Sequence, residues 1–157
     1  MSAADARPSP DVEIDLDLVH LPHEVRGTSV ETTRLRVVDV AGKGRGVLAR
    51  VPLAAGEIIE RVAVIPVAAE QVAHLDRTTL EHYVYDWQGG GVAVALGCGS
   101  LYNHSYAPNA MYRKNFAARV IEYVALVDIA ADDEILINYN GDPKDQSPLW
   151  FHVVERA

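Results

Sequence analysis

Three short segments of the chain carry residue types that could bind a ligand or take part in a reaction. The first, "AGKGRGVLA" at residues 41–49, alternates glycines with Lys43 and Arg45. Glycine allows a ligand to approach the backbone closely and permits positive φ angles. The residues that follow have the pattern of a strand, so the helix N-terminus that binds phosphate in nucleotide folds is missing. Taken alone, this segment is more typical of an ordinary hairpin turn.

The second segment, "SLYNHSYAPNA" at residues 100–110, contains Asn103, His104 and Asn109. A metal site is not indicated, because no second His or Cys stands at ligand spacing from His104. A Ser-His-Asp hydrolase is not indicated either, because the "GxSxG" pattern is absent and no Asp is tied to His104 by spacing. Taken alone, His104 is more typical of a hydrogen-bonded structural residue.

The third segment, "VDIAADDEILINYNGD" at residues 127–142, has the pattern of a turn, a strand and a tyrosine at the strand's end. The three acidic residues 132–134 are typical of a solvated turn. Tyr139, next to Asn138 and Asn140, could present its phenol to a cleft. Taken alone, it is more typical of a tyrosine packed in the core.

The order and spacing of the three segments favour a shared function. "GRGVLA" comes first, then a strand that begins "AAGEII", then "NHSYAPN" at residues 103–109, and about thirty residues later "DDEILINY". This combination resembles the SET domain of protein-lysine methyltransferases, in a small form without the Cys-rich segments that often flank the domain. The resemblance covers residues 34–150. It implies a mainly β fold of small, β-clip-like sheets, in which the C-terminal segment is threaded under a loop as a pseudoknot.

The resemblance also implies that S-adenosylmethionine is the cofactor, held between the glycine turn, the Asn-His pair and the last strand. The implied cofactor-binding residues are Lys43, Gly44, Arg45, Gly46, Asn103, His104, Tyr139 and Trp150. The glycine turn would contact the cofactor's amino-acid end through its backbone, and Asn103 would bind its amino group. The His104 main chain would meet the adenine, and Trp150, or failing that Phe151, would stack on the adenine ring.

The implied reaction is methyl transfer to the side-chain amine of a lysine in a basic protein, of histone-like or ribosomal type. Tyr139 corresponds to the tyrosine regarded as catalytic in the family, and Tyr112 to one that lines the lysine channel. A phenol is protonated near neutral pH, so we expect Tyr139 to orient the amine and methyl group rather than act as a bulk base. Two alternatives stay open: a catalytically silent SET-like protein-binding module, and a methyltransferase that acts on a small molecule or a residue other than lysine.

Composition agrees with a soluble protein of this kind. The chain has 157 residues, of which 49% are hydrophobic, and these values suit one globular domain. The single cysteine, Cys98, excludes an internal disulfide and a multi-cysteine zinc site, so we expect no metal and a cytoplasmic location. The net charge of −8 argues against direct nucleic-acid binding and is compatible with a basic protein partner. No secretory signal or membrane-spanning run is recognisable, so no membrane partner is expected.

The elements that must position these residues are mostly short strands. Val-, Ile- and Tyr-rich segments predict strands at residues 34–40, 46–51, 57–67, 91–96, 109–115, 118–127 and 133–139. Two helices are predicted, one over about Ala68 to Trp87 and a short C-terminal one with Ser147 as N-cap and Pro148 as its first residue. We predict a flexible N-terminal arm over residues 1–25, which could add a strand to a second copy in a homodimer, and a SET domain over residues 26–157.

Overall fold

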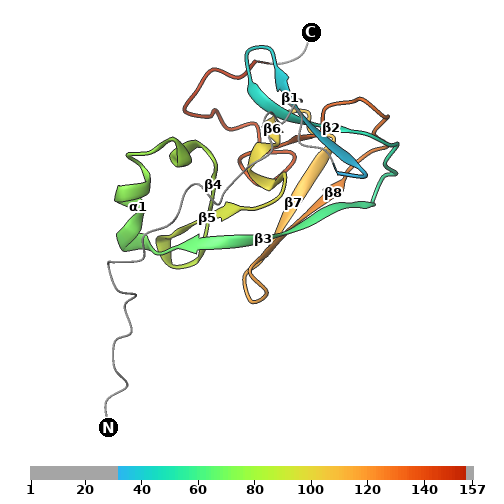
Figure 1. Ribbon diagram of the computed structural model, residues 1–157. Coiled ribbons are helices and arrows are strands. Elements are labelled where there is room, and N and C mark those ends of the chain that lie inside the picture. The colour runs from blue at the N-terminus through green and yellow to red at the C-terminus, as the bar shows by residue number, and fades with distance from the viewer. Residues whose placement is uncertain (1–31, 155–157) are drawn as a thin grey trace, which may run out of the picture.

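The computed structural model describes residues 32–154, which fold into short strands grouped in three sheets (Figure 1). The strands are β1 (Leu35–Val40), β2 (Gly44–Ala49), β3 (Ile58–Val67), β4 (Val84–Asp86), β5 (Val92–Ala95), β6 (Asn103–His104), β7 (Ala110–Asn115), β8 (Val120–Ala125) and β9 (Leu136–Ile137). One α-helix, α1 (Ala69–Leu75), and three 3₁₀ turns, η2 (Thr79–His82), η3 (Gln88–Gly90) and η4 (Gly99–Leu101), complete the described chain. The mainly β architecture is confirmed. The predicted arm over residues 1–25 lies outside the described residues.

The largest sheet has five antiparallel strands in the order β4-β5-β3-β8-β7. Three strands separate its two edge strands, β4 and β7, yet side chains on these edges and just beyond them are in contact. The Tyr85 and Tyr112 ring centroids lie 5.0 Å apart, and those of Trp87 and Phe116 lie 4.8 Å apart. The sheet therefore curls until its edges approach each other, in the direction that the twist of β-strands favours.

The C-terminal segment runs between the β1–β2 hairpin and the polar loop of residues 99–109. On one side, the Ile135 amide donates to the Val47 carbonyl, and Leu48 forms an isolated bridge with Glu134. On the other side, β9 pairs in parallel with β6, and the Ser105 amide donates to the Ile137 carbonyl. This crossing brings together residues some thirty positions apart, as the threaded topology requires.

Aliphatic side chains from every sheet form one core beneath this crossing. Val47, Ile121, Ile135 and Ile137 have no measurable solvent exposure. Truncating an aliphatic side chain of this kind to alanine typically costs about 2–5 kcal/mol of stability. The core therefore fixes β2, β8 and the C-terminal segment relative to one another, and with them the polar residues at their ends.

The helix predicted over Ala68 to Trp87 is wrong for most of its length. Only α1 is α-helical, and Thr78 caps the 3₁₀ turn η2, where its hydroxyl accepts a hydrogen bond from the Leu80 amide. From Val84 the backbone pairs with β5 as strand β4. Alternating β-branched and aromatic residues, together with a free edge on β5, outweigh the near-helical spacing of apolar residues.

The short C-terminal helix predicted from Ser147 is also wrong for the described part of that segment, because residues 147–154 form no helix. Ser147 does not cap a helix; its amide donates to the Asp145 carboxylate, and its carbonyl accepts from Tyr106 and Asn140. The Leu149 amide donates to the Tyr106 hydroxyl. A segment of about ten residues rich in aromatic and β-branched side chains is a marginal helix on its own, so these contacts determine its path.

No helix within residues 32–154 has the length and apolar character needed to cross a lipid bilayer.

Candidate active site

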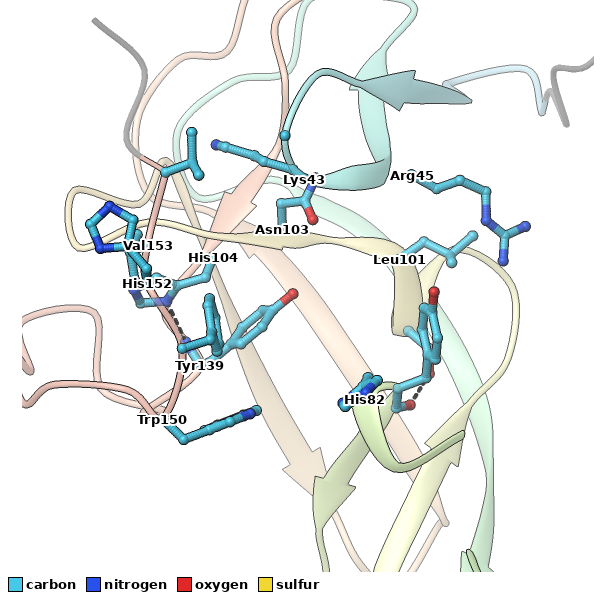
Figure 2. Close-up of a pocket in the computed structure, with 15 residues that line it drawn as sticks. Lys43, Arg45, His82, Leu101, Asn103, His104, Tyr139, Trp150, His152 and Val153 are labelled. Carbon is cyan, nitrogen blue, oxygen red and sulfur yellow. Dashed lines mark hydrogen bonds between the residues drawn. The ribbon is translucent and has the colours of Figure 1, made fainter. Parts of the chain in front are cut away.

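A cavity of about 320 Å³ opens where the glycine turn, η4, β6 and the C-terminal segment converge. Figure 2 shows Lys43 and Asn103 on one wall, Tyr139 and Trp150 on a second, and Leu101 on the opposite side. The C-terminal segment closes this space with the side chains of residues 150–154. The predicted site segments, far apart in sequence, thus line one cavity.

Two glycines of the turn serve different purposes. Gly44 adopts a φ of +73°, and a Cβ added there would meet no atom within 4 Å. At Gly46 an added Cβ would lie 2.7 Å from the Asn103 Nδ2 atom and 2.8 Å from the Glu134 Oε1 atom. Gly44 therefore allows the chain to turn, whereas Gly46 allows Asn103 and Glu134 to pack directly against the backbone of β2.

A buried carboxylate holds the polar side chains of this wall. Glu134 is 3% exposed, and its Oε1 atom accepts a hydrogen bond of 2.8 Å from the Asn103 side-chain amide. Its Oε2 atom lies 3.7 Å from the Lys43 ammonium, whose side chain is only 10% exposed. A buried charge needs a partner to compensate for lost hydration, and Glu134 supplies one to Lys43.

The His104 imidazole links two segments of the site by a hydrogen bond. Its Nδ1 atom accepts a hydrogen bond of 3.1 Å from the Tyr139 amide, which joins the polar loop to the end of β9. Asn109 makes a second link, because its side chain donates to the Glu134 carbonyl and accepts from the Leu136 amide, both at 2.8 Å. These two side chains hold the last strand in register beside the loop.

Tyr139 points its hydroxyl into the cavity from the end of the C-terminal strand (Figure 2). The hydroxyl donates a hydrogen bond of 2.8 Å to the Tyr102 carbonyl. Burial raises the pKa of Tyr139 to about 12, and the neighbouring Tyr83 and Glu134 add to the effect. The side chain is therefore a neutral phenol, fixed in orientation, at physiological pH.

A second cavity, of about 430 Å³, lies on the other side of Tyr139. Tyr85, Tyr112 and Phe116 line it, together with Lys114 and Asp86. The residues common to both cavities are His82, Tyr83, Ser100, Tyr139 and Trp150. The Tyr112 hydroxyl lies 3.5 Å from the Tyr139 carbonyl, and burial raises the pKa of Tyr112 to about 12. Two spaces thus share one wall, which contains the predicted catalytic phenol.

Most of the predicted site residues lie together. Those that line the first cavity are Lys43, Arg45, Asn103, His104, Tyr139, Trp150 and Phe151. Gly44 and Gly46 do not line it: Gly44 lies beside it at the turn, and Gly46 lies behind Asn103. Tyr112 lines the second cavity and not the first.

Sequence reasoning missed three residues of the site. Tyr83 and Tyr85 were placed within a helix, although the alternation of Tyr83, Tyr85 and Trp87 before three glycines is typical of a strand. The acidic run at 132–134 is typical of a solvated turn, but Glu134 is buried. Only the third of the three acidic residues is buried, and no pattern in the sequence distinguishes it from its neighbours.

Gly46 and Gly44 make a matched pair for testing this geometry. Gly46→Ala is expected to displace Asn103, Glu134 or Val40 and to cost about 1–3 kcal/mol of stability through overpacking. It should also weaken, about tenfold or more, the binding of S-adenosylhomocysteine, the probe for the cofactor that the family resemblance implies. Gly44→Ala adds only the strain of a left-handed residue, about 1–2 kcal/mol, and should retain binding. Thermal unfolding and calorimetric titration measure both effects. Equal loss of binding in the two variants would contradict the assigned role of Gly46.

Within residues 32–154 no group of three or more His, Cys, Asp or Glu side chains is placed to hold a metal ion. The side chains at this site offer a buried ammonium, a carboxamide and aromatic rings. This set suits a zwitterionic organic ligand with an aromatic base.

Comparison with known proteins agrees with this architecture. The SET domain family model matches residues 44–140. A Schizosaccharomyces pombe protein named histone-lysine N-methyltransferase, H3 lysine-37 specific, is 36% identical over 118 residues, which are 74% of this chain and 76% of the relative. A crystal structure of a Plasmodium falciparum protein proposed to be a histone methyltransferase is similar with a TM-score of 0.57 and 29% identity, over 69% of this chain and 95% of that one.

A more distant likeness concerns the fold alone. The Polycomb Repressive Complex 2 of Chaetomium thermophilum, in a humanized mutant form bound to the inhibitor GSK126, gives a TM-score of 0.56 at 18% identity. The match covers 68% of this chain and 14% of that one.

Proposed function

The chain belongs to the SET-domain family and is a methyltransferase, and on this premise we propose that it transfers a methyl group from S-adenosylmethionine to the side-chain amine of a lysine in a basic protein. The observation that carries this proposal is the pair of cavities that share Tyr139. The first cavity offers groups that suit the cofactor, and the second offers groups that suit a lysine side chain. The methyl group would pass between them beside one phenol.

The first cavity fits the cofactor's amino-acid end. The Lys43 Nζ atom is buried and has no hydrogen-bond partner among the described residues, although Glu134 compensates for its charge. A ligand carboxylate would satisfy that ammonium, and the side-chain carbonyl of Asn103 can accept from a ligand amine, because its amide group donates to Glu134. Trp150, which is 74% exposed, and Phe151 can stack on the adenine, at about 1–3 kcal/mol per stacked base.

When bound, S-adenosylmethionine supplies an electrophilic methyl group carried on a cationic sulfur. The chain's part is to place the amine and to keep it neutral. Tyr139, protonated and fixed by the Tyr102 carbonyl, presents its hydroxyl oxygen at the junction of the cavities, where it can accept from the amine and orient its lone pair. Tyr85 and Tyr112 enclose the path and exclude water, which disfavours an ammonium.

A lysine in a basic protein is the substrate that suits the second cavity. Aromatic walls can enclose the aliphatic stem of a lysine, and the net charge of −8 favours a positively charged partner. The Schizosaccharomyces pombe relative is named for a histone lysine. We therefore take recombinant histone H3 as the first probe.

Lys43→Met is expected to remove most cofactor affinity, because methionine fills a similar volume without the charge. It also leaves the buried Glu134 carboxylate without its cation, so some stability is lost as well. We expect S-adenosylhomocysteine to bind about tenfold or more weakly, in the range for a charge-assisted hydrogen bond. Calorimetric titration measures this, and Lys144→Met, an exposed lysine outside both cavities, is the control. Unchanged affinity in Lys43→Met would remove its side chain from the cofactor site.

The proposed function is tested by incubating the purified chain with labelled S-adenosylmethionine and acid-extracted basic proteins. The expected result is label on lysine after hydrolysis of the protein product. S-adenosylhomocysteine at a hundred times its dissociation constant should also stabilise the fold by about 2.7 kcal/mol. Stabilisation without transfer would instead indicate a silent binding module. The absence of both stabilisation and transfer would overturn the proposal.

A further inference from the structure

Lys114 is a charged residue of the second cavity that the proposed mechanism does not use. It lies on edge strand β7, on the same face as Tyr112, because side chains alternate along a strand. Its ammonium lies 5.6 Å from the centroid of the Tyr112 ring and donates a hydrogen bond of 2.8 Å to the Asp86 carbonyl. The chain thus places one of its own ammonium groups on the wall that a target lysine would pass.

The curled sheet explains how this ammonium is held. Asp86 lies on β4 and Lys114 on β7, the opposite edges of the five-stranded sheet. The Lys114 hydrogen bond closes the gap between these edges, flanked by the Tyr85–Tyr112 and Trp87–Phe116 contacts. One hydrogen bond therefore holds the amine, and an aromatic contact on each side of it holds the two edges together.

The other charged or titratable groups that line this cavity come from η2, β4 and the tyrosines. On η2, Glu81 and His82 are exposed, and the His82 Nε2 atom lies 3.3 Å from the Glu81 Oε1 atom. On β4, the Asp86 carboxylate is exposed. Burial raises the pKa of Tyr112 and Tyr139 to about 12 and raises the pKa of Tyr85 and Tyr102 as well, so these four phenols are neutral near physiological pH. Tyr83 lies at the junction with the first cavity.

Lys114 differs from the two carboxylates in its solvation. The exposed charges of Glu81 and Asp86 are screened by water and salt. Lys114 is partly buried, and this desolvation lowers its pKa, while the Asp86 carboxylate opposes the change. A partly desolvated cation exerts a stronger field across an aromatic, water-poor space than an exposed charge does. A second amine in that space is therefore harder to keep protonated.

We propose that the Lys114 ammonium promotes deprotonation of the target lysine in the second cavity. The inference rests on the proposed function, in which a neutral amine must attack the methyl group. A nearby cation disfavours the protonated form of an amine and so makes the neutral form available at lower pH. The released proton passes to solvent, and Lys114 itself keeps its proton throughout.

The test is the pH dependence of kcat for methyl transfer at saturating recombinant histone H3, between about pH 6.5 and about pH 10, because kcat reports the ionisation of the bound lysine. In Lys114→Met, the midpoint of the rising limb is expected to move by about half to one pH unit toward alkaline pH. The rate at about pH 7.5 should fall roughly three- to tenfold, and the two profiles should converge above the limb. Lys114→Arg, which keeps the charge, should retain the wild-type midpoint.

Arg113→Met is the matched control, since it removes a cation from the next residue of β7, which is exposed and outside the cavity. Its midpoint should stay at the wild-type value. Retained S-adenosylhomocysteine binding shows that each variant is folded, and Lys114→Gln replaces Lys114→Met if the latter fails to fold.

Coincident midpoints for Lys114→Met and wild type would overturn the inference. An equal shift in Lys114→Arg would overturn it too, because packing rather than charge would then be responsible. Absence of transfer by the wild type at every pH would overturn the proposed function itself, and this inference with it.

Discussion

Tyr139→Phe is expected to lower kcat for methyl transfer by about 10²–10³-fold while S-adenosylhomocysteine binds almost as tightly as to the wild type. The ring and its contacts with His104 and Phe151 stay in place, at centroid distances of 5.3 and 6.2 Å. Only the hydroxyl that donates to the Tyr102 carbonyl is lost, and with it the oxygen at the junction of the two cavities. Single-turnover kinetics and calorimetric titration measure the two quantities separately.

The control is Tyr123→Phe. The Tyr123 hydroxyl lies 3.0 Å from both the Gly99 carbonyl and the Tyr85 hydroxyl, and Tyr123 itself lines neither cavity. Loss of this hydroxyl should reduce stability by about 1 kcal/mol and leave kcat close to the wild-type value. Equal loss of transfer and of cofactor binding in Tyr139→Phe would remove Tyr139 from the catalytic role.

The pKa of Tyr139 adds a second expectation. Because burial raises that pKa to about 12, the phenol stays protonated over the whole range in which the enzyme would be assayed. A rise of activity between neutral and mildly alkaline pH therefore reports the target amine and not Tyr139. The residual activity of Tyr139→Phe should keep the wild-type midpoint, and a midpoint lost with the hydroxyl would contradict this assignment.

Glu134→Ala is expected to destabilise the fold by about 3–5 kcal/mol, the range for breaking a buried ion pair. The substitution leaves the Lys43 ammonium buried without a carboxylate and removes the acceptor of the Asn103 amide. Cofactor binding should fall with it, because Lys43 and Asn103 lose their common partner. Chemical denaturation and S-adenosylhomocysteine titration measure the two losses.

Two variants separate the roles of this carboxylate. Glu134→Gln keeps an acceptor for Asn103 and loses the charge, so we expect an intermediate loss of stability. Asp133→Ala, at an exposed side chain next in sequence, should change stability by less than about 0.5 kcal/mol. Similar losses in Asp133→Ala and Glu134→Ala would show that Glu134 is only part of a turn.

The sequence predicts the strands well because their signal is local. β1, β3 and β8 follow Val- and Ile-rich runs bounded by turn residues, and the structure confirms them. The site residues on the glycine turn, the polar loop and the last strand are recognised by their joint order, although each segment alone has an ordinary explanation. Nothing local indicates that β6 and β9 pair in parallel; the family resemblance implies only that the C-terminal segment is threaded under a loop.

The failures arise where tertiary contacts decide. Val84 and Tyr85 are not helical, because they pair with the edge of β5 in the sheet. Residues 147–149 do not form the first turn of a helix, because Tyr106 and Asn140 bind their backbone. Glu134 is a buried charge because Asn103, some thirty residues earlier in the chain, and Lys43, some ninety residues earlier, contact it. None of these partners could be identified from the neighbouring sequence.

The central claim is that Tyr139 stands between a cofactor cavity and a lysine cavity of one methyltransferase. The most direct test is mass spectrometry of recombinant histone H3 incubated with S-adenosylmethionine and either the wild-type chain or Tyr139→Phe, with both proteins first shown to bind S-adenosylhomocysteine. Methyl groups are expected on lysine side chains of histone H3 after incubation with the wild type, and almost none after incubation with Tyr139→Phe. Equal methylation by the two proteins, or methylation of a residue other than lysine, would contradict the central claim.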